Sequence, residues 1–181
     1  MVQMLLDYEA DVNLKGGENG YALIAAVSAG HMDVYYGNTL TVASICGNKA
    51  MVQLLLEKGA AFDGGKAIRD TALMVAASQG FTEVVELLLD KCADINAQNQ
   101  ADETALCLAA AGGETETVQP LLSRGASSDL QENCYDKAKR AAFKGWGEPE
   151  QKLVVLKLLD EAEERQYQLH ELRNWATFHH R

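Results

Sequence analysis

The side chains best suited to catalysis in this chain are its four cysteines and four histidines. A cysteine acts as a nucleophile when a histidine within hydrogen-bond reach takes its proton. Cys46 and Cys107 are the candidate nucleophiles, and His31 is the histidine that lies in the same part of the chain. His31 directly follows a glycine, where a second helix is expected to start. The sequence therefore predicts no catalytic residue and a protein that is not an enzyme.

Metal, disulfide and phosphate chemistry have little support. The cysteines contain no Cys-x-x-Cys pair, so they are interpreted as free thiols of a reducing compartment, the cytoplasm or the nucleus. His170, His179 and His180 lack the i, i+4 spacing of helical zinc ligands. The glycine pairs at 16–17 and 64–65 are not followed by Lys-Ser or Lys-Thr. We expect no metal, no cofactor and no phosphate-binding loop.

The composition describes a folded protein that avoids polyanions. Apolar residues make up 48% of the chain and charged residues 23%, and the net charge is −10. Such a charge repels nucleic acid and anionic membrane surfaces. The nearest basic cluster is Lys137, Lys139 and Arg140, with Glu132 and Asp136 beside it, and we interpret it as a solvated helix face. We predict no nucleic-acid partner and no membrane association.

The elements that must position any site repeat with a period of 33 residues. Three series share this register: Leu40, Leu73 and Leu106; Gly47, Gly80 and Gly113; Ala60, Ala93 and Ala126. Each period contains a short apolar helix that ends at a glycine, a second helix rich in valine and leucine, and a polar loop. Two helices of about ten residues cannot bury both faces alone, so each pair must pack on the next. The sequence predicts an all-α solenoid of stacked helix pairs.

These residues resemble the ankyrin repeat, whose pattern is approximately T-P-L-H-x-A-A-x-x-G-H-x-x-V-V-x-L-L-L-x-x-G-A-D-V-N. The resemblance covers roughly residues 2–145. The segment from Tyr36 to Leu40 is similar to the ankyrin arrays of large fungal signalling proteins, as if this chain were a fragment of one. The resemblance implies an ankyrin-repeat solenoid that binds another protein through a concave groove.

Several positions depart from the family pattern. The opening threonine survives at Thr104, but Cys107 replaces the histidine, so we expect an incomplete hydrogen-bond network there. Pro120 lies inside the expected second helix and should delay or kink it. Cys92 occupies the place that Gly59 has in the preceding repeat, which predicts a strained or differently closed turn.

The expected domains are the repeats, residues 1–145, and a C-terminal helical cap, residues 146–181. The first repeat is partial, and the second is 16 residues short after Val34. Either most of one repeat has been deleted, or Val34 and Tyr35 are not neighbours in the complete protein; we favour the second. The cap is expected to be one long helix that begins at Pro149. Its apolar stripe has three-and-four spacing and consists of Val155, Leu159, Ala162, Leu169, Leu172 and Ala176.

The resemblance places the partner-binding residues at the loop tips and near the ends of the first helices. The tips are Tyr35, Tyr36 and Asn38, then Lys66, Ile68 and Arg69, then Asn99, Gln100, Asp102 and Glu103. The helix ends contribute Ile45, Ser78 and Gln79. Tyrosine, arginine and an exposed isoleucine suit such a surface because they combine a large contact area with directional polar groups.

Two other functions stay open at this point. One is an enzyme that encloses a small molecule in a pocket of the repeat scaffold. The other is a structural spacer or dimerisation element, in which Tyr167, Trp175 and Phe178 of the cap helix pair two copies. We expect a monomer or a weak dimer through that helix.

Overall fold

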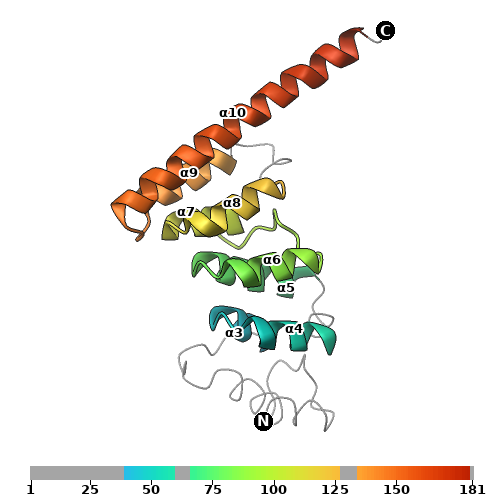
Figure 1. Cartoon of the computed structure of the whole chain (residues 1–181), viewed down its shortest axis with the longest axis vertical. Helices are drawn as coiled ribbons and strands as arrows, with labels where there is room; N and C mark the ends of the chain where they lie inside the picture. Colours follow the sequence, from blue (N-terminus) through green and yellow to red (C-terminus); the bar gives the residue numbers. More distant parts are fainter. Residues whose placement is uncertain (1–38, 60–65, 127–133, 180–181) are drawn as a thin grey trace.

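The computed structural model describes residues 39–59, 66–126 and 134–179, and the side chains of most of them. Figure 1 shows the helices stacked as successive pairs. The pairs are α3 (Thr39–Ile45) with α4 (Lys49–Glu57), α5 (Lys66–Ser78) with α6 (Thr82–Asp90), α7 (Ala105–Gly112) with α8 (Thr115–Ser123), and α9 (Cys134–Lys144) with α10 (Pro149–His179). No strand occurs in these ranges. The predicted all-α solenoid of stacked helix pairs is confirmed.

The core lies between successive pairs. First helices contact first helices from α3 through α9, and second helices contact second helices from α4 through α10. Leu40, Leu73 and Leu106, the leucines of the 33-residue series, are each at most 1% exposed. Small residues such as Ala76 and Ala109 are fully buried beside them, which lets the first helices approach closely. The repeat period therefore directly marks the residues that hold the stack together.

The turns follow the expected backbone chemistry, including the predicted strained one. Gly47 and Gly80 end the first helices with φ of +64° and +71°. Gly59 has φ of +82° after the second helix α4, and Cys92 takes the same place after α6 with φ of +66°. A side chain in this left-handed region crowds the following carbonyl oxygen. Cys92 thus has the same left-handed turn geometry as Gly59, with the strain that a side chain brings to it.

The expected delay of the second helix at Pro120 is wrong. Helix α8 begins at Thr115, 33 residues after the start of α6 at Thr82. Its first turn is closed by hydrogen bonds from the Thr117 and Val118 amides to the Glu114 carbonyl. Pro120 lies in the second turn, where it removes a single amide donor. The helix therefore keeps its register.

Helix α5 differs from the other first helices in its start. It begins at Lys66, whereas the register of α7, which starts at Ala105, would begin it at Ala72. Lys66, Ile68 and Arg69 consequently lie in the first turns of a helix, and their predicted location at a loop tip is wrong.

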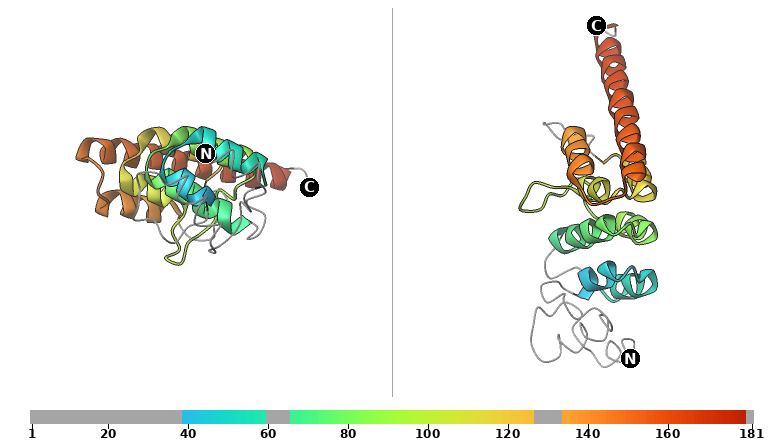
Figure 2. Two further views of the ribbon diagram at one scale, coloured as in Figure 1. Left: turned by 90° about the horizontal axis from the view of Figure 1, so that it is seen from below. Right: turned by 90° about the vertical axis from the view of Figure 1, so that its left-hand side faces the viewer.

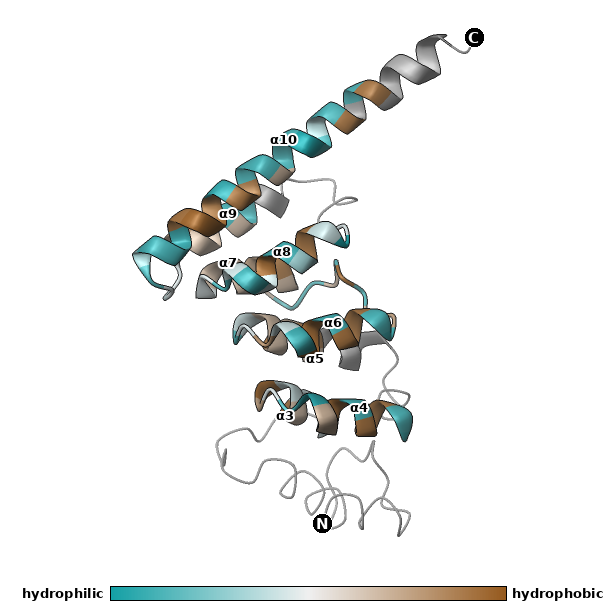
Figure 3. Cartoon of the chain, in the orientation of Figure 1, coloured by the Kyte–Doolittle hydropathy of each residue, from teal (hydrophilic) through white to brown (hydrophobic). Residues whose placement is uncertain are grey.

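The cap is a helix pair whose second helix is unusually long. Helix α10 has 31 residues, whereas α4, α6 and α8 have nine each. Val155 and Leu159 are fully buried and Ala162 is 8% exposed. Leu169 and Leu172 are 57% and 62% exposed, so the first half of the expected apolar stripe is buried and these two residues are not. Apolar residues continue along the part of α10 that projects from the stack (Figure 3).

Lys139 joins the two helices of the cap. Its Nζ lies 2.6 Å from Oδ1 of Asp160 and 2.5 Å from Oε2 of Glu163. The hydrogen bonds to Asp160 and Glu163 raise the pKa of Lys139, against a smaller opposing effect of burial. Helices α9 and α10 are therefore linked by ion pairs as well as by packing.

Several predictions concern residues 1–38, which lie outside the described ranges. They are the partial first repeat, the shortened second repeat and the junction of Val34 with Tyr35. Within the described ranges, no helix has both the length and the apolar character needed to cross a membrane.

Candidate partner-binding groove

The loop between α6 and α7 forms a structured tip at residues 99–103. The Asn99 amide donates to the Glu103 carbonyl at 3.0 Å. The Asn99 side chain accepts from the amides of Ala101 (2.9 Å) and Glu103 (3.0 Å), and its Nδ2 donates to Oε2 of Glu103 (3.0 Å). The Asn99 side chain therefore supplies the hydrogen-bond partners that the backbone amides of this turn need. Figure 2 shows the yellow-green loop projecting beyond the helix pairs.

The four predicted binding residues of this tip have two different roles. Asn99 and Glu103 are half-buried and hold the turn together. Gln100 and Asp102 are exposed, and Asp102 has φ of +56°, a conformation that aspartate tolerates better than most residues. Gln100 and Asp102 are thus the two that are available to a partner.

The floor of the groove is α7, which contributes Cys107 and Ala111 to its lining. Thr104 caps this helix, because its Oγ1 accepts from the Cys107 amide at 3.3 Å. The Thr104 hydroxyl also lies 3.5 Å from the Cys107 sulfur, and both residues are buried. The hydrogen bond that caps α7 is therefore present although Cys107 stands where the resemblance expects a histidine.

The opposite wall is α9. Lys137, Arg140 and Lys144 are spaced by three and four residues, which places them on one face of the helix. They line a cavity of about 520 Å³ together with Asp102 and Glu103 of the tip. The tip and α9 thus form two walls of one groove, with α7 between them.

The turn between α9 and α10 brings an aromatic side chain to this groove. A Cβ added at Gly145 would lie 2.0 Å from the Ala111 carbonyl oxygen, and one at Gly147 would lie 2.3 Å from that of Gly112. Only glycine allows the turn to seat so closely on the end of α7. Between them, Trp146 lines the cavity and is 71% exposed. Lys152 fixes the turn further by donating to the Gly145 carbonyl.

The groove has a different charge on each wall. Among the described residues, Lys137, Arg140 and Lys144 form no ion pair with a carboxylate. On the facing tip, Glu103 is held by Asn99 and Asp102 is exposed. A ligand in the groove would meet three cations on one side and two carboxylates on the other.

The remaining predicted site residues lie elsewhere. Ile45 and Ser78 are half-buried near the ends of α3 and α5, and Gln79 follows α5 and is exposed. None of the three lines the cavity. Tyr35, Tyr36 and Asn38 are outside the described residues, as are the side chains of Lys66, Ile68 and Arg69.

Sequence reasoning missed the α9 wall and Trp146. The three-and-four spacing of Lys137, Arg140 and Lys144 indicates a common face, but it does not show that this face borders a groove. The Gly-Trp-Gly segment at residues 145–147 was an available signal, because two glycines around an exposed aromatic residue fit a turn packed closely on other backbone.

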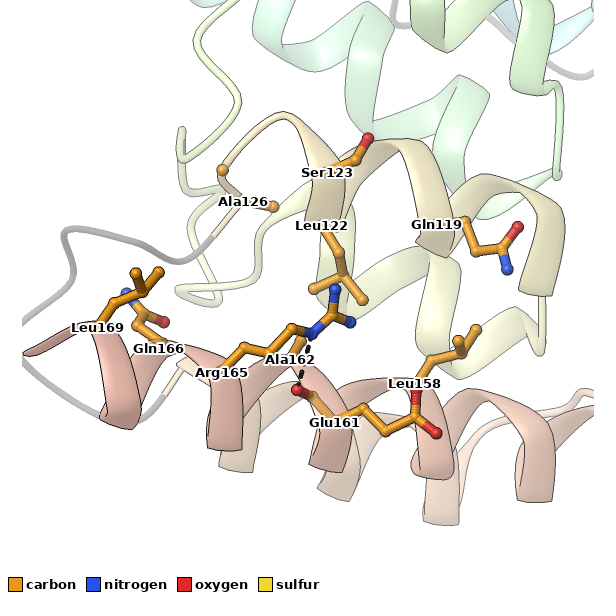
Figure 4. Close-up of a pocket in the computed structure, with 11 residues that line it drawn as sticks. Gln119, Leu122, Ser123, Ala126, Leu158, Glu161, Ala162, Arg165, Gln166 and Leu169 are labelled. Carbon is orange, nitrogen blue, oxygen red and sulfur yellow. Dashed lines mark hydrogen bonds between the residues drawn. The ribbon is translucent and has the colours of Figure 1, made fainter.

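A second cavity, of about 580 Å³, lies between α8 and α10 (Figure 4). Leu122 from α8 and Leu158 from α10 point into the space between the two helices. Arg165 lines it too, and its Nε donates to the Glu161 carbonyl at 3.0 Å. Both polar and apolar side chains line this cavity between α8 and α10. It lies at the second helices, away from the 99–103 tip.

The two cysteines considered as nucleophiles, Cys46 and Cys107, are poorly suited to catalysis. Cys107 is buried, and burial raises the pKa of the half-buried Cys46 thiol, which disfavours the reactive thiolate. In the described ranges, no three metal-ligating side chains gather into a possible metal site. The histidine side chains lie outside what the structure describes.

Stacked helix pairs with a projecting loop tip define the class of helical-repeat proteins. Within that class, a family model for ankyrin repeats in three copies matches residues 40–133. The chain belongs to the ankyrin-repeat family, whose members are generally protein–protein interaction modules. A search of curated proteins finds no match. The family match ends at residue 133, just before α9 begins, so it includes the tip wall of the groove and not the α9 wall.

Proposed function

We propose that this chain is a non-catalytic interaction module that binds another protein in the groove between the 99–103 tip and α9. The observation that carries the proposal is the cavity that these two walls share with the exposed Trp146. The family relationship supports protein binding in general, and the groove gives it a location. The free thiols support a reducing compartment such as the cytoplasm.

The groove suits binding because its parts are already in place. The tip is closed by the hydrogen bonds of Asn99, and the Trp146 turn is seated on α7. A preorganised surface loses little conformational freedom on association. Tryptophan is also prominent among the residues that dominate binding energy, because it buries a large area with few rotatable bonds.

The test is a pull-down from an extract of the source cells with the native chain, Trp146→Ala and Tyr167→Ala. Tyr167 is the matched control, because it is 65% exposed on α10 and does not line the groove. We expect a protein that is retained by the native chain and by Tyr167→Ala but lost from Trp146→Ala, with equal helicity in all three. Equal retention by Trp146→Ala would refute the groove as the binding site.

A second candidate function is weak self-association through α10. Tyr167, Leu169 and Leu172 are each more than half exposed on the projecting part of that helix. Sedimentation equilibrium of the native chain and of Leu169→Glu/Leu172→Glu tests this function. A dimer that dissociates in the variant supports it, and a native chain that stays monomeric at high concentration rejects it.

A further inference from the structure

The cations of α9 are divided between two tasks. Lys139 is paired with Asp160 and Glu163 of α10 and holds the cap together. Lys137, Arg140 and Lys144 face the groove, and in the described part of the chain they have no ion pair with a carboxylate. Three cations on one helix face repel one another, which costs stability unless an anion is present. The arrangement therefore fits a ligand that supplies negative charge.

The rest of the molecule makes this basic wall unusual. The chain has a net charge of −10, yet α9 contains four basic residues and one acidic one. A positive wall on an acidic protein does not arise from overall composition. It creates a local positive potential that favours partners with negative charge.

The opposite wall limits what kind of anion fits. Asp102 and Glu103 line the same cavity from the tip. A uniform polyanion such as a nucleic acid strand would lie against both carboxylates. A polypeptide can instead direct its carboxylates to α9 and present other groups to the tip.

Building on the proposed function, we infer that the groove binds an acidic segment of the partner protein. Its carboxylates lie along Lys137, Arg140 and Lys144, and an apolar side chain packs on Trp146. Arg140 offers planar, bidentate pairing to a carboxylate, and its Nε already donates to the Asp136 carbonyl at 3.3 Å, which restrains it on the helix. The tryptophan face supplies the uncharged contact.

The test begins with selection of random peptides of about twelve residues, displayed on phage, on the full-length chain, with depletion on Trp146→Ala. We expect the enriched peptides to be acidic and to share an aromatic or aliphatic residue. Synthetic copies should bind the native chain at least tenfold more tightly than they bind Lys137→Gln/Arg140→Gln/Lys144→Gln, and the affinity should fall as salt rises.

The control variant is Lys58→Gln/Lys91→Gln/Lys157→Gln, which makes the same change in net charge at positions that do not line the groove. It should bind the peptides like the native chain. If the groove variant fails to fold, Arg140→Gln alone is used, with a shallower salt dependence as the expected result.

Three outcomes would overturn the inference. They are enrichment of neutral or basic peptides, enrichment of no peptide, and tighter binding of a thymidine oligonucleotide than of any acidic peptide. The pull-down with Trp146→Ala tests whether the groove binds a partner, separately from whether the bound segment is acidic. A partner that is lost from that variant but contacts the groove with a neutral segment would reject the acidic ligand and leave the groove's function standing.

Discussion

The aromatic ring of Phe81 lies against Gly47, so close that a Cβ at Gly47 would be 2.7 Å from the ring. The next repeat has the same relationship, since a Cβ at Gly80 would be 2.1 Å from Oε2 of Glu114. In each case the residue just before the second helix of one repeat packs on the glycine that ends the first helix of the repeat before it. These glycines therefore serve both the left-handed turn and the contact between layers.

This contact predicts that Gly47→Ala destabilises the stack through two separable effects. Left-handed backbone costs a non-glycine residue about 1–2 kcal/mol, and the clash with Phe81 adds about 1–3 kcal/mol. In the Phe81→Ala background the clash is absent, so the cost of Gly47→Ala should fall to the backbone part. Urea unfolding of the four proteins of this cycle measures the difference. An equal cost in both backgrounds would contradict the contact.

Cys92 allows the opposite change. Its φ of +66° carries strain that glycine does not have, and its side chain is exposed. Cys92→Gly should raise the free energy of unfolding by about 0.5–1 kcal/mol, the gain being reduced by the extra freedom of glycine in the unfolded chain. Cys92→Ala is the control, because it removes the thiol and keeps the strain. A similar gain in both variants would show that the thiol is the cause, not the backbone.

Asn99→Ala should open the tip without unfolding the stack. The change removes the acceptor for the Ala101 and Glu103 amides, and both amides should exchange with deuterium faster. Partner binding in the groove should weaken about tenfold, because the tip must then be ordered on binding. Gln100→Ala is the control for the exchange measurement, since Gln100 is exposed and holds no part of the turn. Unchanged exchange in Asn99→Ala would show that the backbone alone fixes the tip.

Most of the fold could be predicted from the sequence, because a repeat places equivalent residues in equivalent environments. The period predicted that Leu40, Leu73 and Leu106 would share one core position, and the alignment with Gly59 predicted the strained turn at Cys92. Local signals sufficed in both cases.

The site was less predictable, because it depends on contacts between segments far apart in the chain. The close seating of Gly145 on Ala111, which directs Trp146 to the groove, has no periodic signature. The extra helical turns at the start of α5 were also missed, because the loop position was transferred from the family pattern. The spacing of the apolar residues likewise does not show which part of α10 packs against another helix pair.

Glu114 predicts a pH dependence of stability. Desolvation by burial raises the pKa of this carboxyl above its ordinary value of 4.5, so the folded state holds the proton more tightly than the unfolded state does. The resulting stability is fully present below the ordinary pKa and is lost as the pH rises through the raised pKa. Glu114→Gln should therefore stabilise the protein at about pH 7, and this gain should shrink toward about pH 4.

The measurement is urea unfolding of the native chain and Glu114→Gln at both pH values. Glu116→Gln is the matched control, because Glu116 is an exposed carboxyl in the first turn of the same helix. A gain in Glu114→Gln that does not change with pH would point to lost packing or hydrogen bonding rather than to the buried charge.

The two halves of α10 should respond differently to the same substitution. Leu159 is fully buried against the last layer, so Leu159→Ala should cost about 2–5 kcal/mol through lost burial and a residual cavity. Leu169 is 57% exposed, and Leu169→Ala should change the free energy of unfolding by less than about 0.5 kcal/mol. Urea unfolding at low protein concentration makes the comparison on monomeric chains. A large cost for Leu169→Ala under these conditions would mean that the projecting half of α10 is covered by part of the same chain, and the division of this helix into a cap and a free extension would be wrong.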